Sequence, residues 1–246
     1  MSLPLEGPLE GKIALVSGAS RGIGYAAAKA YGKAGAHVIA VARTVGGLEE
    51  LDDEIKAAGG SATLVPLDLK NGDGIDTLGG AIYERWGKLD ILLANAGILG
   101  SITPLGHMSP KEFDDVMAIN VTANWRLIRS LDPLLRQSDS GRVLFMSSSV
   151  ARIQRAYWGA YAMSKAALEA MAITYAKETE QTPIKTLIIN PGGLRTAMRA
   201  KAIPGEDPST LKTPDDLAPY LVELCSNDLE KSATLWDFKS KNFTDI

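Results

Sequence analysis

The sequence predicts an α/β fold, a single doubly wound parallel sheet with helices on both faces. Short, almost wholly apolar runs recur along the chain, segments with helical periodicity separate them, and no Pro-, Gly- or Ser-rich linker interrupts the alternation. Apolar strands joined by helices are typical of parallel sheets that are covered on both sides. The 246 residues, 46% hydrophobic and 22% charged, suffice for one core of this kind. We therefore expect one domain over residues 1–246.

Each predicted strand is a brief apolar run, and each predicted helix shows a 3.6-residue period. The strands, in order, are Ile13–Val16, His37–Val41, Ala62–Leu67, Leu89–Leu93, Arg142–Met146 and Ile184–Ile189. The helices are Gly22–Ala34, Leu48–Ala58, Asp73–Trp86, Ser109–Arg136 and Tyr161–Thr179. Ligands of such sheets bind beyond the carboxyl ends of the strands. Candidate site residues are therefore sought where strands end.

A glycine-rich segment, Ser17-Gly-Ala-Ser-Arg-Gly-Ile-Gly24, follows the first strand directly, and a helix begins inside it. Glycines let backbone N–H groups approach a pyrophosphate, which then lies at the positive end of the helix dipole. The spacing Gly-x-x-x-Gly-x-Gly differs from the general dinucleotide fingerprint, but its place between strand and helix predicts a nucleotide site. The predicted contacts are Gly18, Ser20, Arg21, Gly22, Ile23 and Gly24.

The end of the second strand bears on the choice between NADP and NAD. An NAD-binding protein places an acid here to hold the ribose 2′-hydroxyl, whereas this chain has Ala42-Arg43-Thr44. Arg43 and Arg21 can both reach a 2′-phosphate, which favours NADP(H) and leaves NAD(H) as the alternative. The competing interpretation makes both arginines solvated surface residues. Strand ends further along supply the remaining predicted contacts, Asp68, Leu69, Asn95, Ala96 and Gly97.

Tyr161 and Lys165 are four residues apart on a predicted helix and therefore share a face. Ser148 lies at the end of the fifth strand and Asn190-Pro191-Gly192 at the end of the sixth, so these features converge on one rim of the sheet. Carbonyl reduction needs a proton donor and a polar group that holds the oxygen. Tyr161 is the predicted donor and Ser148 the holder. Lys165 would lower the pKa of Tyr161, and both side chains would also contact the cofactor.

Together these motifs resemble the short-chain dehydrogenase/reductase family, in its ordinary rather than extended branch. The resemblance covers residues 9 to about 225 and implies a Rossmann-like fold and hydride transfer between nicotinamide and a carbonyl or secondary alcohol. It implies that Asn120 completes a proton relay to the lysine. From the residues alone, Asn120 is a structural hydrogen-bonder in an apolar helix. The family also places Pro191, Gly192 and Thr196 beside the nicotinamide.

Several expectations concern residues outside these motifs. Residues 193–213 follow the last strand and are predicted to form a mobile lid over the substrate; the alternative is a solvated loop. Their cations raise the weaker hypothesis of an acidic substrate. A second Tyr-x-x-x-Lys pair, Tyr25 and Lys29, is interpreted as part of an amphipathic surface helix. The other wall of the substrate site is predicted to contain Arg152, Gln154, Tyr157 and Trp158.

The helices predicted over Ser109–Arg136 and Tyr161–Thr179 are apolar over more than one stripe. Such helices need burial on a second side, so we expect a homodimer in which they pair across a two-fold axis. The chain end lacks the Asp-Gly-Gly ending frequent in tetrameric members of the family. A tetramer is therefore the less favoured alternative.

Composition excludes several classes of function. The net charge is −3 and the basic residues are scattered, so no nucleic-acid partner is expected. No apolar run is long enough to predict a membrane span, and a cytoplasmic location is expected. No metal-ligand spacing occurs, and the single cysteine, Cys225, is interpreted as a small buried side chain. The predicted function is oxidoreduction of a small carbonyl or alcohol; the alternative is a catalytically idle NADP(H)-binding sensor or interaction module.

Overall fold

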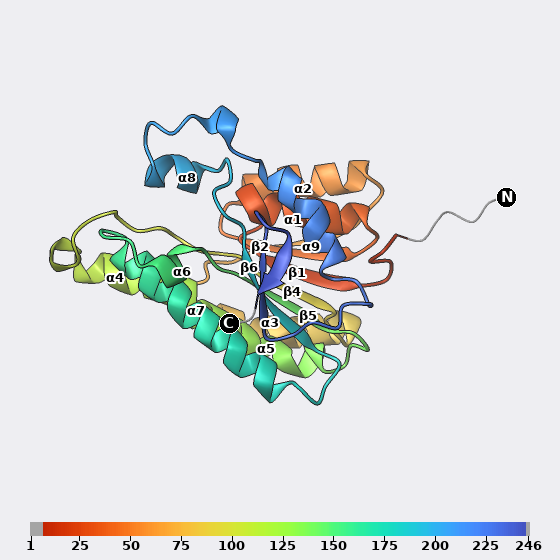
Figure 1. The fold of residues 1–246 in the computed structure, drawn as a ribbon. Helices are drawn as coiled ribbons and strands as arrows, with labels where there is room; N and C mark the ends of the chain where they lie inside the picture. The colour runs from red at the N-terminus through yellow and green to blue at the C-terminus, as the bar shows by residue number, and fades with distance from the viewer. Residues whose placement is uncertain (1–6, 245–246) are drawn as a thin grey trace.

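The computed structural model describes residues 7–244, which form one sheet in the strand order β3-β2-β1-β4-β5-β6-β7-β8 (Figure 1). Every pairing from β3 to β7 is parallel, and β8 pairs antiparallel with β7. The strand bounds are β1 Ile13–Ser17, β2 His37–Ala42, β3 Ser61–Pro66, β4 Ile91–Ala94, β5 Arg142–Met146, β6 Lys185–Asn190, β7 Thr234–Asp237 and β8 Asn242–Thr244.

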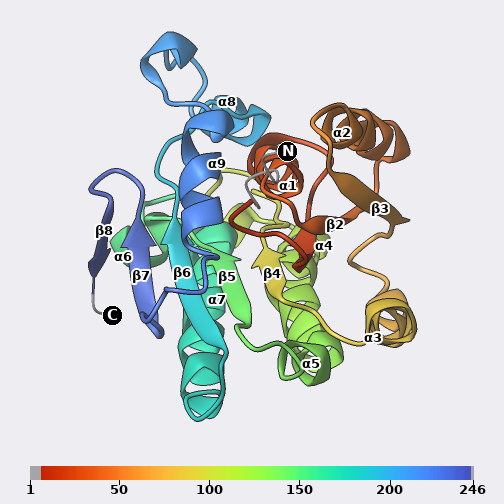
Figure 2. The ribbon, with the colours of Figure 1, turned by 90° about the vertical axis from the view of Figure 1, so that its right-hand side faces the viewer.

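Helices cover both faces of this sheet, which confirms the doubly wound prediction: α1, α2 and α9 lie on one side and α3, α5 and α7 on the other (Figure 2). Within residues 7–244, none of the helices has the length and apolarity required to span a bilayer. The helix bounds are α1 Gly22–Lys33, α2 Val45–Ala57, α3 Gly72–Trp86, α4 Pro110–Met117, α5 Ala123–Leu135, α6 Val150–Ile153, α7 Gly159–Glu178, α8 Ala197–Ala202 and α9 Pro214–Glu223.

The central strands are apolar throughout because both of their faces are buried. In β1, Ala14 and Val16 point into the core beneath α1 and α9, whereas Ile13 and Leu15 point into the core beneath α3 and α5. Successive side chains of a strand alternate between faces. A run of consecutive apolar residues, rather than an alternating pattern, therefore marks a strand in the middle of this sheet.

The six predicted strands all form, and two further strands that the sequence pattern did not predict lie at one edge of the sheet. β7 and β8 extend the sheet beyond β6, with Trp236 paired to Ile189 on one side and to Phe243 on the other. These strands span four and three residues and carry polar side chains. Such short segments become strands because a neighbour offers hydrogen bonds, which periodicity does not reveal.

The helix predicted over Ser109–Arg136 is also divided. A π-helical segment, Ala118–Thr122, lies between α4 and α5 and contains Asn120. Single π-turns inside α-helices often occur at functional sites.

Asp90 links the amino-terminal ends of β1, β4 and the loop before β5. Its fully buried carboxylate accepts hydrogen bonds from the backbone N–H of Ile13 (2.9 Å), the hydroxyl of Ser138 (2.6 Å) and the ammonium of Lys88 (3.1 Å).

Asp90→Ala should lower the free energy of unfolding by about 2–4 kcal/mol, because buried donors lose their acceptor. Urea denaturation measures this. Asp139→Ala, at an exposed position beside Ser138, should change stability by less than about 0.5 kcal/mol, and equal stability losses would contradict the prediction.

Candidate active site

The carboxyl ends of β1 and β4 are joined by Ser17, the last residue of β1. Its hydroxyl accepts hydrogen bonds from the backbone N–H groups of Asn95 and Ala96, at 3.0 Å each, and donates to the carbonyl of Leu93 at 3.3 Å. The Asn95 amide in turn donates to the carbonyls of Ser17 (3.0 Å) and Gly18 (3.4 Å). Ser17 stands where the family usually has threonine, and the hydroxyl is what this network uses.

The glycine loop packs directly against these turns. A Cβ at Gly24 would collide with the carbonyl of Gly18, and one at Gly18 would lie 3.0 Å from the Cα of Ala96. Among the described residues, no side chain caps the amino terminus of α1, and its first turn has no acidic residue. The free N–H groups and the close approach of the backbone fit a pyrophosphate.

Other predicted cofactor residues converge on this loop. Arg43, directly after β2, and Asp68, after β3, lie side by side with Nη1 and Oδ2 3.9 Å apart, and both side chains are exposed. Across the loop, a Cβ at Gly22 would lie 3.7 Å from the methyl group of Thr196. The loop is also bonded to β2, where the N–H of Gly18 donates to the carbonyl of Val41 at 2.8 Å. Gly192 adopts a positive φ of 66° in the turn after β6.

Ser148 and Tyr161 are brought together by β5 and α7. Tyr161 is almost fully buried, and this burial raises the pKa of its phenol to about 12, against a smaller lowering by the hydrogen bond with Ser148. The structure therefore brings the two predicted hydroxyls near each other, and burial favours the protonated phenol.

Lys165 lies one turn further along α7. Its buried ammonium donates a 2.7 Å hydrogen bond to the carbonyl of Met146 and lies 5.7 Å from the ring centroid of Tyr161. Burial lowers the pKa of Lys165 to about 8, and Glu169 opposes that shift. We expected the lysine to lower the pKa of Tyr161. In the structure burial of the phenol dominates that pKa, and the ammonium donates its recorded hydrogen bond to a carbonyl.

Asn120 connects the turn after β4 to α7. Its Oδ1 accepts from the N–H of Ile98 (2.8 Å), and its Nδ2 donates to the carbonyl of Ile98 and to the hydroxyl of Ser164, both at 2.9 Å. A Cβ at Gly97 would lie 3.3 Å from Asn120 Oδ1 and 3.5 Å from Lys165 Nζ. These contacts are those of a structural hydrogen-bonder beside the lysine, and the proton relay stays a prediction.

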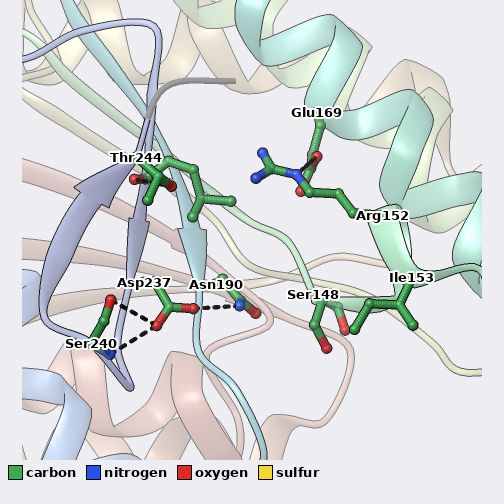
Figure 3. A pocket seen from close by; sticks show the side chains of 10 residues that line it. Ser148, Arg152, Ile153, Glu169, Asn190, Asp237, Ser240 and Thr244 are labelled. Atoms are coloured by element: carbon green, nitrogen blue, oxygen red, sulfur yellow. Dashed lines mark hydrogen bonds and ion pairs between the residues drawn. The ribbon is translucent and has the colours of Figure 1, made fainter.

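A pocket of about 280 Å³ adjoins Ser148 between α6, α7 and the β6–β8 edge (Figure 3). The buried carboxylate of Glu169 accepts from the hydroxyl of Ser147 (2.6 Å) and from Nε of Arg152 (3.0 Å). On the facing side, Asn190 donates to Asp237 at 2.7 Å. Sequence reasoning missed both acids. Glu169 follows Lys165 by one helical turn, which could have indicated it, whereas Asp237 lies on an unpredicted strand.

Two predictions of ordinary structural roles are confirmed. Lys29 pairs with Glu54 at 3.2 Å and with Asp215 at 3.4 Å on the outer face of α1, so the second Tyr-x-x-x-Lys pair belongs to a surface helix. Cys225 is buried, with its sulfur 3.4 Å from the hydroxyl of Tyr31. Of the residues predicted for the substrate wall, Arg152 lines the pocket beside Ser148 and is paired there with Glu169.

Three features together define a nucleotide-dependent oxidoreductase. They are the parallel sheet, the glycine loop at an uncapped helix end, and the pair of hydroxyls beside a buried lysine. The chain belongs to the short-chain dehydrogenase family, whose model, described as short chain dehydrogenase, matches residues 12–207. It is an NAD(P)-dependent enzyme of the ordinary branch, as the sequence resemblance predicted.

Relatives agree with this assignment. The chain is 42% identical over 228 residues to the uncharacterized oxidoreductase YciK of Escherichia coli K12, covering 92% of this chain and 90% of that protein. A short chain dehydrogenase of Shigella flexneri solved with NADP superimposes with a TM-score of 0.91 at 41% identity, covering 95% of this chain and 99% of that one. One from Escherichia coli CFT073 solved with NADPH gives 0.89 at 41% identity, with the same coverages.

Proposed function

We propose that this protein is an NADP(H)-dependent oxidoreductase that interconverts a carbonyl and a secondary alcohol. The observation that carries the proposal is the proximity of the Ser148 hydroxyl to the buried phenol of Tyr161, with the buried Lys165 one turn further along α7, at the rim that also holds the glycine loop. The relatives solved with NADP and NADPH support the cofactor. Arg43 and Arg21 are the side chains that would hold the 2′-phosphate.

The chain's own residues supply the proton chemistry. Bound NADPH supplies the hydride that reaches the carbonyl carbon. Ser148 donates a hydrogen bond to the carbonyl oxygen, and Tyr161 transfers its phenolic proton to that oxygen as it becomes an alcohol. Lys165 stabilises the phenolate left behind and bonds the cofactor ribose. The relay through Asn120 returns the proton from solvent. The balance is one carbonyl, NADPH and one proton to one alcohol and NADP⁺.

The rate of reduction, measured as kcat/KM, is expected to fall as pH rises through about 8. Burial lowers the pKa of Lys165 to about 8, so its charge is present below that pH and lost above it. Tyr161, with a pKa of about 12, keeps its proton throughout that interval. A steady-state profile at saturating NADPH measures the decline. Lys165→Arg, whose guanidinium stays charged, should remove it, and a wild-type profile that stays level to about pH 10 would refute the assignment.

The proposal is tested by titrating the purified protein with NADPH and NADH, then following NADPH oxidation with ketones, aldehydes, quinones and keto acids. Tighter binding of NADPH together with turnover is the expected result. Tight binding without turnover across the panel would favour the idle sensor.

We also infer a homodimer formed through α5 and α7. Trp125 on α5 and Met163 on α7 are 48% and 41% exposed, and a second copy that covered them would remove their apolar surface from water. Light scattering at micromolar concentration should give a dimeric mass. A monomeric mass would contradict the inference. A tetrameric mass would instead support the tetramer that is the less favoured alternative.

A further inference from the structure

We propose that the substrate carries an uncharged, apolar group beside its carbonyl, and that α8 supplies the surface that selects it. The inference rests on the proposed function and names its substrate class. It replaces the hypothesis, raised by the cations of residues 193–213, that the substrate is acidic.

Tyr161 lies in a small apolar cluster that is separate from the two cores of the sheet. The buried members are Leu99 from the loop after β4, Val150 from α6, and Tyr161 and Ala162 from α7. The ring of Trp158 packs against that of Tyr161, with centroids 6.2 Å apart. The proton donor is thus surrounded by hydrocarbon and aromatic groups from segments far apart in the chain.

The short helix α8 completes this cluster. Met198 and Ala202 pack against it and remain partly exposed. They are four residues apart and therefore lie on one face of α8. Thr196, which the family places at the nicotinamide, caps the same helix by accepting from the N–H of Arg199 at 3.1 Å. One side of α8 therefore faces both the proton donor and the predicted cofactor.

The two arginines of residues 193–213 are engaged elsewhere, whereas Lys212 is exposed. The guanidinium of Arg199 forms a two-bonded ion pair with Glu206, with both N–O distances 2.6 Å, and a Cβ at Gly193 would lie 3.2 Å from its Cζ. Arg195 donates from Nε to the carbonyl of Pro208 at 2.7 Å. These bonds fold the segment onto itself and satisfy the charges locally. Lys201 is exposed.

A carboxylate placed against this apolar face would lose its hydration, and the guanidinium groups nearest the site, those of Arg152 and Arg199, are already paired with Glu169 and Glu206. Burying an unpaired charge is costly, whereas a methyl or longer alkyl group gains from burial. The apolar face of α8 thus favours ketones and aldehydes over keto acids.

A pair of probes isolates this effect. 2-Octanone and 2-oxooctanoate differ in having a methyl group or a carboxylate beside the carbonyl. Their binding to the enzyme–NADP⁺ complex, in which reduction cannot proceed, is measured by tryptophan fluorescence. We expect the ketone to bind at least about tenfold more tightly. Equal or tighter binding of the keto acid, or failure of the ketone to bind at millimolar concentration, would overturn the inference.

Two charge changes on α8 make the test specific. Met198→Glu should weaken 2-octanone binding by about tenfold and leave NADP⁺ affinity unchanged, while Met198→Leu should bind normally. Lys201→Glu, which alters charge at an exposed position of the same helix, should bind the ketone as the wild type does. Unchanged ketone affinity in Met198→Glu would contradict the role of α8.

The binding and turnover assays separate the two proposals. If the protein binds 2-octanone more tightly but reduces neither probe, the substrate inference stands and the proposed reaction is refuted. If the protein reduces 2-oxooctanoate faster than 2-octanone, the proposed reaction stands and the substrate inference is refuted.

Discussion

Replacing Tyr161 with phenylalanine should lower kcat for carbonyl reduction by about 10²–10⁴-fold, the usual contribution of a positioned general acid. The ring stays in its apolar cluster beside Trp158, so the substrate surface is retained and only the phenolic oxygen is lost. NADPH affinity should change by less than about twofold, because other residues make most of the predicted cofactor contacts. Steady-state kinetics and a fluorescence titration of NADPH measure the two quantities.

Tyr25→Phe is the matched control, because Tyr25 belongs to the second Tyr-x-x-x-Lys pair and its hydroxyl bonds Glu54 on the surface of α1. This variant should turn over at the wild-type rate. If Tyr161→Phe retained full turnover, another group would be the proton donor. If the wild type showed no turnover and both variants bound NADPH equally, the idle sensor would be the better description.

Replacing Arg43 with aspartate should change the ratio of NADPH to NADH affinity by at least about 100-fold in favour of NADH. A charge-assisted bond from arginine to the 2′-phosphate contributes about 1.5–3 kcal/mol. The aspartate would remove it, repel the phosphate and offer an acceptor to the 2′-hydroxyl of NADH. Arg43 is more than half exposed and its partner Asp68 is 3.9 Å away, so the arginine is free to turn toward a phosphate.

Arg43→Ala separates the lost attraction of the arginine from the added repulsion of the aspartate, because it removes the arginine without adding an acid. The ratio of NADPH to NADH affinity for this variant should lie between the ratios for the wild type and Arg43→Asp. Arg129→Asp, at an exposed position on α5, is the control for a general change of charge. An unaltered ratio in Arg43→Asp would show that the 2′-phosphate is held elsewhere and would leave NAD(H) as an equal cofactor.

Much of the fold was predictable because each central strand is buried on both faces and therefore appears as an unbroken apolar run. The motif spacing also placed Ser148, Tyr161 and the glycine loop at one rim, since parallel strands end on the same side. β7 was not predictable in this way. Thr234–Asp237 becomes a strand because β6 offers an open edge, and β8 then pairs with β7.

The sequence by itself determined the order of the first six strands, the glycine-rich loop between a strand and a helix, and the candidate pair Ser148 and Tyr161, because these depend on local periodicity and spacing. Only the tertiary structure decided the electrostatics of Tyr161 and Lys165 and the apolar surroundings of the phenol. Burial, which depends on every neighbouring element, raises the pKa of Tyr161 and lowers that of Lys165. Likewise the pairing of Arg199 with Glu206, seven residues along the chain, turns a cationic segment into an apolar face toward the site.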